Sequence, residues 1–484
     1  MQGSTDRNWA LALLLLTLVR LAAAAAVPIA PDEAYYWIWS GALAWGYLDH
    51  PPMVAAWIRA GTLVLGETPL GIRLLGPLGL ALASVALWDA GRRLFPARPG
   101  AGAWGAALFN ATLFANAGAV LVTPDTPLVV FWCLALWAAV RLHVSQDGRW
   151  WLAVGCFAGL ALLSKYTAVL LGLGLAIWVV GAARHWLLRW QLWAGGALAV
   201  LIFAPVIAWN AAHGWASFAK QGGRAGTATG GAGLRFVWEF LGGQAGLATP
   251  LVFVLCVVGG AVALWAALRR RDAGAALLAA LIVPGAALFL WQATGSRVQG
   301  NWPAILYPAA CLAAAGMLGP RWDGWRRPAL GLGLVLAILG LVQATLGPLP
   351  LPRRSDPSLA RLAGWTAFTA EVEAARRDAG LAFVAAEEYG LAAELALRLP
   401  PGVAVMAISD RWDLFNLPTP ESGVTGLLVR SERRGEGAPL WPEAVPLGGI
   451  IRARGGIEAE RYRLYRVTVR AEMPPVAVLP RPKP

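Results

Sequence analysis

Long continuous apolar runs constrain the fold of this chain more than any other feature of its sequence. Of its 484 residues, 58% are hydrophobic, and the mean hydropathy is +0.58. Each run can cross a hydrocarbon layer about 30 Å thick as a helix, and such runs are not typical of a soluble core. We therefore predict an α-helical polytopic membrane protein with about eleven spanning helices, at residues 9–30, 70–91, 101–122, 126–143, 150–164, 167–183, 191–210, 247–268, 274–292, 303–319 and 329–347.

The arginines are distributed in a way that predicts the orientation of the chain. The formal net charge is +13, which in a soluble protein would suggest a nucleic-acid partner. Here the arginines gather in every second connection between the runs, as the positive-inside rule requires of cytoplasmic loops. They are Arg92, Arg93, Arg98, Arg141, Arg149, Arg184, Arg189, Arg269, Arg270, Arg271, Arg321, Arg326 and Arg327. With Arg7 on the same side, we expect a cytoplasmic N-terminus and no nucleic-acid partner.

The composition changes at residues 347–357, where prolines and charged residues replace the apolar runs. A break of this kind is typical of a domain boundary. We expect a transmembrane domain at residues 1–347, with two outer loops at 31–69 and 211–246. A small soluble α/β domain is expected at 348–472, and a disordered proline-rich tail at 473–484.

The soluble segment shows the pattern of a β-α-β unit. Apolar stretches at Leu381–Ala386 and Val403–Ile408 predict buried strands, and Tyr389–Leu399 between them predicts a helix. Further strands are expected at Gly423–Val429 and Tyr462–Val469. Because an odd number of spans precedes this domain, we expect it on the outer face of the membrane.

Three acidic residues lie at the outer ends of expected spans. Asp32 and Glu33 follow the first apolar run, and Asp125 lies in a short turn before the fourth. A carboxylate beside a membrane-borne substrate can act as general base for an incoming hydroxyl or amine. Each of these acids could instead cap a helix. The nearby Asp49 favours a catalytic role for Asp32 and Glu33 over a capping role.

Two histidines lie near the same expected face. Asp49 and His50 precede Pro51 and Pro52, and His213 opens the second outer loop. Aspartate with histidine is a ligand pair for a divalent metal ion, so Asp49 and His213 are candidate metal ligands. The alternatives are a turn stiffened by the two prolines and a hydrogen-bonded structural histidine.

The outer face also carries candidate contacts for an anionic group. Lys165, one of only three lysines in the chain, lies at the outer end of an expected span. Its ammonium group suits a phosphate or lipid headgroup as a point charge, and snorkelling to the interface is the alternative. The candidate phosphate or headgroup contacts are His50, Lys165, Tyr166, Lys220, Arg224, Arg297 and Asn301.

Several common catalytic motifs are missing from the sequence. It has no G-x-G-x-x-G after a strand, no P-loop and no G-x-S-x-G, so it does not indicate a nucleotide sugar, ATP or an acyl-serine mechanism. A transporter or flippase of lipid-linked sugars, or an inactive scaffold, would be the alternatives to an enzyme. Transporters place ionisable groups near the bilayer midplane. Here these groups cluster at outer helix ends, which favours the enzyme.

The motifs, taken together, resemble those of the membrane glycosyltransferases of the GT-C fold. The nearest family is bacterial glycosyltransferase family 39, and the lipid A aminoarabinose transferase and protein O-mannosyltransferases are more distant. The motifs are Pro31-Asp32-Glu33-Ala34-Tyr35-Tyr36, Gly46-Tyr47-Leu48-Asp49-His50-Pro51-Pro52, Thr123-Pro124-Asp125, Ser164-Lys165-Tyr166-Thr167, Trp209-Asn210-Ala211-Ala212-His213-Gly214-Trp215 and Asn301-Trp302-Pro303. Tyr389-Gly390-Leu391-Ala392-Ala393-Glu394 and Asp410-Arg411-Trp412-Asp413-Leu414 are similar more weakly.

This resemblance implies an activity and a location. The expected reaction transfers a sugar, with inversion, from a polyprenyl phosphate carrier to lipid A, another glycan, a lipid or a protein. The expected place is the periplasmic face of the bacterial inner membrane. The resemblance implies that Asp32 is the catalytic base with Glu33 beside it, and that Asp125 is the second acid of the site.

The resemblance also implies roles for the remaining polar residues. Asp49 and His50 take the places of a glutamate and a lysine in the aminoarabinose enzyme, and His213 matches a metal-binding histidine. The change to His50 weakens the headgroup contact, because a histidine is only partly charged at neutral pH. Polyprenyl phosphate is a good leaving group, so cations or a metal ion are expected to neutralise it as it departs.

Overall fold

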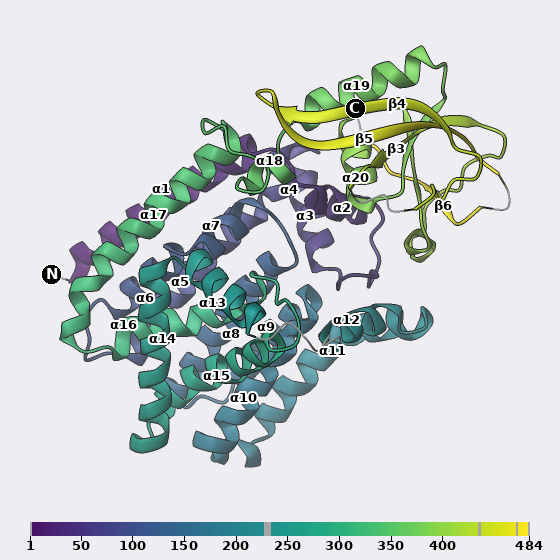
Figure 1. The fold of residues 1–484 in the computed structure, drawn as a ribbon. Coiled ribbons are helices and arrows are strands. Elements are labelled where there is room, and N and C mark those ends of the chain that lie inside the picture. Colours follow the sequence, from purple (N-terminus) through teal and green to yellow (C-terminus); the bar gives the residue numbers. More distant parts are fainter. Residues whose placement is uncertain (1, 227–233, 434–436, 471–472, 483–484) are drawn as a thin grey trace. The chain divides into compact units, whose positions relative to one another are not determined.

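Two compact units make up the computed structural model, which describes residues 2–226, 234–433, 437–470 and 473–482 (Figure 1). The helical unit comprises residues 1–22, 49–54 and 74–339, and the mixed unit comprises residues 23–48, 55–73 and 340–484. The mixed unit therefore includes residues 23–48 and 55–73 as well as the segment after the expected boundary near residue 347. Much of the expected first outer loop belongs to the same unit as the C-terminal domain, because its helices pack there.

Helices account for most of the chain (Figure 1). Their bounds are α1 (Gln2–Ala26), α2 (Pro31–Gly41), α3 (Met53–Leu65), α4 (Pro69–Arg73), α5 (Leu75–Leu94), α6 (Ala101–Asn110), α7 (Leu113–Val120), α8 (Asp125–Ser145), α9 (Trp150–Ser164), α10 (Val169–Ala182), α11 (Trp190–Ala212), α12 (Ala216–Gly226), α13 (Arg235–Leu247), α14 (Pro250–Trp265), α15 (Ala273–Ala293), α16 (Tyr307–Met317), α17 (Asp323–Thr345), α18 (Pro357–Arg361), α19 (Trp365–Asp378) and α20 (Tyr389–Arg398).

Seven helical segments among the described residues are long and apolar enough to cross a membrane. They are Arg7–Ala26, Pro69–Leu94, Asp125–Ser145, Trp190–Ala212, Pro250–Arg270, Ala273–Ala293 and Pro320–Thr345. Four shorter apolar helices, at Met53–Leu65, Trp150–Ser164, Tyr166–Ala182 and Trp302–Met317, accompany them. The expected polytopic α-helical fold is confirmed. Seven of the expected spans are helices of that length, and three more, at 150–164, 167–183 and 303–319, coincide with shorter apolar helices.

The expected span at 101–122 is broken into α6 and α7 by polar side chains. The Asn116 amide donates to the backbone carbonyls of Asn110 and Thr112, at 2.8 Å each, and the Thr112 hydroxyl accepts from the Ala115 N–H at 3.1 Å. Such side chains satisfy backbone groups in place of a continuous helix. Hydropathy averages over the break, so the sequence pattern did not indicate it.

A buried arginine of α1 contacts the same break. The Arg20 guanidinium is fully buried and donates to the side-chain oxygens of Asn110, at 2.7 Å, and Asn116, at 2.9 Å. A charge inside an apolar bundle is costly unless every donor finds a partner. Arg20 therefore joins α1 to α6 and α7 by hydrogen bonds, a contact that the sequence pattern did not indicate.

Glycines allow close helix packing in the helical unit. A methyl group at Gly155 of α9 would come within 2.0 Å of the Gly195 carbonyl oxygen of α11. A methyl group at Gly91 of α5 would likewise come within 2.6 Å of the Gly102 backbone of α6. Small residues let helix backbones approach closely where there is no hydrophobic force between apolar helices in lipid. These crossings set the positions of the helix ends that carry polar groups.

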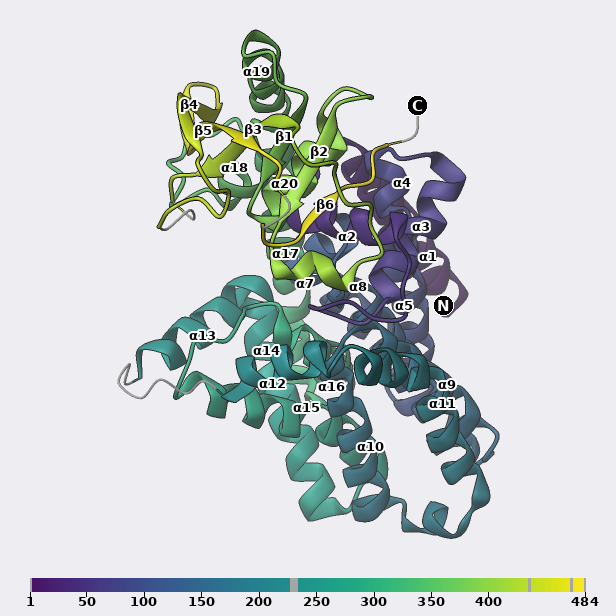
Figure 2. The same cartoon turned by 90° about the vertical axis from the view of Figure 1, so that its right-hand side faces the viewer.

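The mixed unit contains a six-stranded sheet (Figure 2). Its strand order is β4-β5-β3-β1-β2-β6, with bounds β1 (Phe383–Ala386), β2 (Ala404–Ile408), β3 (Thr425–Ser431), β4 (Val445–Arg454), β5 (Ile457–Thr468) and β6 (Val476–Val478). β1 pairs in parallel with β2 and β3, and α20 connects β1 to β2. The expected β-α-β unit is present at almost the expected residues.

The C-terminal segment corrects one expectation. Residues 473–484 were expected to be disordered, but β6 pairs antiparallel with β2, with Val478 opposite Met406. The Arg481 guanidinium donates to the carbonyls of Leu395, at 3.0 Å, and Pro400, at 2.9 Å, at the end of α20. The proline content of the segment indicated disorder. Composition alone does not show that the edge of β2 is available for pairing.

The two expected outer loops also hold helices. The first, at 31–69, contains α2 and α3. The second, at 211–246, contains α12 and α13, separated by residues outside those described. Helices therefore carry part of the polar residues of both loops.

Candidate functional site

Asp32 lies in the first turn of α2 in the mixed unit. Its side chain is 39% exposed, and Oδ1 accepts a hydrogen bond from the Tyr389 hydroxyl at 3.1 Å. Arg361 Nη1 lies 3.5 Å from Oδ2. The N-terminal end of a helix favours the ionised form of a carboxylate, through its unpaired N–H groups and dipole. Asp32 is thus an accessible carboxylate with one oxygen held by a neighbouring side chain.

Glu33, the adjacent acid, has a different environment. Its side chain is 1% exposed, and both oxygens accept from Arg73, at 2.7 Å from Nε and 2.6 Å from Nη2. Glu33 also accepts from the Ala30 N–H at 3.0 Å, at the start of α2. Arg73 donates further to the carbonyls of Ala24, Val27 and Pro28. We infer that Glu33 positions α2, because its oxygens are occupied in a dry environment.

Breaking this pair should destabilise the protein strongly. Arg73→Met removes the guanidinium that donates to the buried Glu33 carboxylate and to three carbonyls, and removing one partner of a buried pair costs about 3–5 kcal/mol. The thermal midpoint of the purified protein in detergent measures the loss. Arg59→Met, a partly buried arginine of α3, is the matched control. Equal midpoints for the two variants would contradict this account.

Three residues from distant motifs meet in the helical unit. Asp125 begins α8, Lys165 follows the end of α9, and Asn301 precedes the 3₁₀ turn at Trp302–Leu306. Lys165 Nζ lies 2.7 and 2.8 Å from the two oxygens of Asp125, and Asn301 Nδ2 donates to Oδ2 at 2.6 Å. The Lys165 and Asp125 side chains are only 8% and 13% exposed. The cluster brings a largely buried cation and acid together with an exposed amide.

A second pair joins Asp49 to α12. Lys220 Nζ lies 2.7 Å from Asp49 Oδ1, and Gln221 Nε2 donates to the Asp49 carbonyl at 2.5 Å. His50 follows directly and is partly buried. The sequence did not indicate Gln221. Its partner is a backbone oxygen, which any residue at position 49 would supply, so no motif marks the contact.

Tyr166 lies beside the start of α12. Its hydroxyl shares a hydrogen bond with Ser217 Oγ at 2.8 Å, and Asn210 Nδ2 lies 3.5 Å away. Asn210 Oδ1 in turn accepts from the Phe218 N–H at 3.3 Å. These bonds hold α12, and with it Lys220, against the helical core.

His213 contacts its own helix. Its ring stacks on Trp209 with centroids 4.2 Å apart, and Nδ1 lies 2.7 Å from the Trp209 carbonyl. Within residues that the structure describes, no group of three or more His, Cys, Asp or Glu side chains could hold a metal ion. The assignment of Asp49 and His213 as metal ligands stays a prediction.

Arg297, another expected cation, lies apart from these groups. Arg297 Nη2 pairs with Glu239 of α13 at 2.8 Å, and Arg235 pairs with the same carboxylate at 2.9 Å. The hydrogen bonds from Arg235 and Arg297 lower the pKa of Glu239. This is an exposed surface cluster. The side chain of Arg224, the other expected cation, lies outside the described residues.

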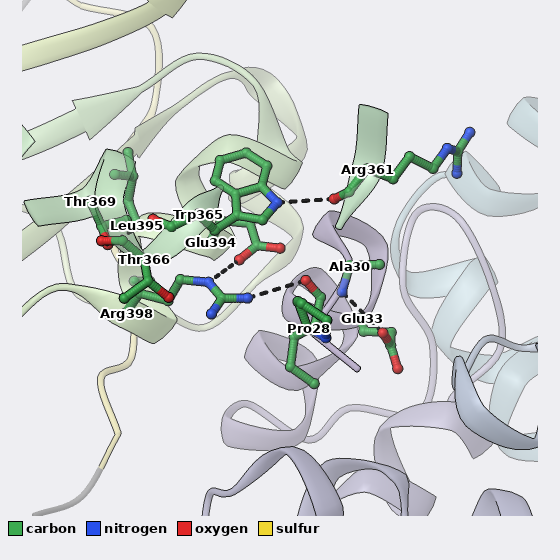
Figure 3. A network of polar contacts seen from close by, with 12 residues as sticks. Pro28, Ala30, Glu33, Arg361, Trp365, Thr366, Thr369, Glu394, Leu395 and Arg398 are labelled. Atoms are coloured by element: carbon green, nitrogen blue, oxygen red, sulfur yellow. Dashed lines mark hydrogen bonds and ion pairs between the residues drawn. The ribbon is translucent and has the colours of Figure 1, made fainter. Parts of the chain in front are cut away.

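Glu394 of α20 is a further buried acid. Its carboxylate is fully buried and accepts from Arg398 Nε at 2.6 Å, and Arg398 Nη2 donates to the Ile29 carbonyl at 3.2 Å (Figure 3). In the same network Trp365 Nε1 donates to the Arg361 carbonyl at 2.9 Å. Burial raises the pKa of Glu394 to about 7, and the charge and hydrogen bond of Arg398 oppose that rise.

This raised pKa predicts a pH-dependent stability. Between pH 4.5 and about 7 the folded protein keeps a proton on Glu394 that the unfolded chain has released. Folding then takes up a proton, so the free energy of unfolding should fall as pH rises through this window, by up to ~1.4 kcal/mol per pH unit. Thermal midpoints from pH 5 to 8 measure it. Glu394→Gln should flatten the slope and Glu387→Gln should not; equal slopes would contradict the prediction.

Comparison with known proteins places the chain among membrane sugar transferases. Residues 49–209 match the family model described as dolichyl-phosphate-mannose-protein mannosyltransferase. The chain is 29% identical over 374 residues to the lipid A galacturonosyltransferase RgtD of Rhizobium johnstonii, covering 75% of this chain and 76% of the relative.

Solved structures share the fold. ArnT from Cupriavidus metallidurans, in the apo state, superposes with a TM-score of 0.64 at 16% identity, over 96% of this chain and 98% of that chain. The same protein bound to undecaprenyl phosphate superposes with a TM-score of 0.64 at 16% identity, over 97% of this chain and 99% of that chain. The agreement over almost the whole length confirms the expected fold, a helical membrane domain followed by a small soluble domain.

Proposed function

We propose that the chain is a family 39 member of the GT-C membrane glycosyltransferases and that it transfers a sugar from a polyprenyl phosphate carrier to an envelope acceptor. The carrier is consistent with ArnT, whose structure was solved with undecaprenyl phosphate bound. The acceptor class is lipid A, another glycan, a lipid or a protein. RgtD, which acts on lipid A, favours the first of these.

The observation that carries this proposal is the placement of the lysines. The chain has three, and two of them, Lys165 and Lys220, pair with Asp125 and Asp49 within the helical unit. In a sugar phosphodiester the phosphate carries one negative charge, and a second develops as the sugar leaves. A cation whose stem is flexible and whose carboxylate partner is adjacent can turn toward that charge and stabilise it.

Asp32 is the proposed base of the reaction. The acceptor hydroxyl attacks C1 of the sugar, the bond from C1 to the carrier phosphate oxygen breaks, and the hydroxyl proton passes to the Asp32 carboxylate. Attack opposite the leaving group inverts the configuration at C1. The half-exposed Asp32 oxygen is suited to this role. The buried, paired Glu33 is not.

The arginine pattern supports a periplasmic location of the reaction. The arginine-rich connections indicate the cytoplasmic side. We therefore propose that Asp32, Asp125 and the C-terminal domain all face the periplasm. Carriers of this kind present their sugar at the membrane surface, where acids and cations at helix ends can reach it.

The test is transfer by the purified protein in lipid vesicles. The vesicles contain undecaprenyl phosphate carrying galacturonic acid, aminoarabinose or mannose, together with lipid A, and mass spectrometry follows the acceptor. We expect a mass increase of one sugar on the acceptor and an equal amount of free undecaprenyl phosphate. Movement of the labelled carrier across the bilayer without sugar transfer to any acceptor would support a transporter instead.

The natural acceptor can be found in cells. Lipid, glycan and protein extracts from deletion and wild-type strains should differ by one sugar on a single class of molecule. The same class should accept sugar in the vesicle assay. If no extract differs while the gene is expressed, the proposed transfer is wrong.

A further inference from the structure

Two weaker motifs of the C-terminal segment lie against α2 within the mixed unit. Tyr389 begins α20, and Arg411 lies in the 3₁₀ turn at Asp410–Leu414. Both contact the helix that carries Asp32. The approach is close, because a methyl group at Gly390 would lie 2.9 Å from the Pro31 side chain. The comparison with the family had indicated these motifs only weakly, and the proposed reaction leaves them without a role.

The ring of Tyr389 is held from two sides. The Tyr35 ring lies with its centroid 4.5 Å away, and the Arg411 guanidinium lies 4.4 Å from the Tyr389 centroid. Arg411 also donates to the Tyr35 hydroxyl at 2.8 Å. A cation over an aromatic face and a packed ring restrict rotation of the tyrosine. From this restrained ring the Tyr389 hydroxyl donates to Oδ1 of Asp32.

The restraint matters because Asp32 is half-exposed. An accessible carboxylate on its own can turn about its side-chain bonds, and a base is efficient only when its proton-accepting oxygen is fixed. A hydrogen bond to Oδ1 selects one rotamer and leaves Oδ2 toward the exposed Arg361, on the side open to solvent. Forming the bond restricts Tyr389 little further, because its ring is already held by Tyr35 and Arg411.

We propose that Tyr389 is a positioning residue for Asp32 and that Arg411 holds Tyr389 in place. The proposal rests on the proposed function, in which Asp32 is the base. It makes the C-terminal domain part of the catalytic apparatus through a group that does not touch the sugar. Residues 357 positions apart then act as one unit.

Tyr389→Phe tests this directly, because it removes the hydroxyl and keeps the ring. We expect kcat for sugar transfer to fall about ten-fold or more, since hydrogen bonds to charged groups are among the stronger ones. The KM for the carrier-linked sugar and the thermal midpoint should stay at wild-type values. Tyr462→Phe is the matched control, a buried tyrosine of β5 whose hydroxyl lies 3.4 Å from Arg452; its kcat should be unchanged.

Arg411 gives an independent arm. Arg411→Gln should lower kcat in the same direction as Tyr389→Phe, and the two changes combined should lower it no more than the larger single effect. Full multiplication of the two effects would overturn the proposed link between Arg411 and Tyr389.

The remaining outcomes separate the two proposals. An unchanged kcat in Tyr389→Phe, with Asp32→Asn inactive, would overturn the positioning role and leave the proposed function intact. A parallel loss of kcat, carrier affinity and thermal midpoint in Tyr389→Phe would show a merely structural role. Full activity of Asp32→Asn would overturn the assignment of the base, and the positioning role with it.

Discussion

Asp32→Asn is expected to lower sugar transfer by about 10²–10⁴-fold while the protein still folds and binds its carrier. The amide has nearly the same shape as the carboxylate and can still accept the Tyr389 hydrogen bond. It cannot accept the proton of an attacking hydroxyl at neutral pH. The loss should appear in kcat and leave the KM for the carrier-linked sugar unchanged, because the amide removes an interaction used only as the bond forms.

A control must separate loss of the base from loss of charge near the surface. Asp378→Asn changes an exposed aspartate at the end of α19 in the same unit, and its kcat should match the wild type. Transfer rates in vesicles and carrier binding are measured for both variants. Wild-type transfer by Asp32→Asn would show that another group takes the proton.

Lys165→Met should lower kcat by about 10²–10³-fold, the effect of removing one group that stabilises developing charge. The methionine keeps the length of the stem without the ammonium. It also leaves the largely buried Asp125 carboxylate with its hydrogen bond from the Asn301 amide but without the ammonium. We therefore expect some loss of stability in addition to the loss of transfer.

A second change separates these two effects. Lys165→Met combined with Asp125→Asn removes the uncompensated charge, so the thermal midpoint should recover while transfer stays low. Arg235→Met, which changes an exposed cation of α13, is the control and should transfer at the wild-type rate. Recovery of transfer in the double variant would show that Lys165 acts only through packing and charge balance.

The sequence pattern predicted several features of the fold correctly. Apolar runs located the helices because a membrane span needs about twenty apolar residues. The apolar stretches on either side of the segment that begins at Tyr389 identified the strand, helix and strand of the C-terminal domain. The sequence pattern did not predict the break between α6 and α7, where the side chains of Asn116 and Thr112 form hydrogen bonds with the backbone. The sequence pattern also did not predict β6, because the pairing of an edge strand depends on a neighbour distant in sequence.

The candidate site divides in the same way. Asp125, Lys165 and Asn301 could be expected to face one side, because they lie at span ends on the same side of the membrane. That Lys165 and Asn301 bind the same carboxylate required the tertiary structure, since helix packing sets which ends meet. Glu33 and Asp32 look equivalent in the sequence, and the structure distinguishes them.

What the sequence determined by itself is the class of protein and the kinds of polar group present, because these follow from local hydropathy and charge. What the tertiary structure decided is the partner of each group. Arg73 occupies Glu33, and Tyr389 holds Asp32 from 357 positions away. Burial and pairing depend on residues brought together by packing, so an exposed acid and a buried one, adjacent in the chain, have different chemistry.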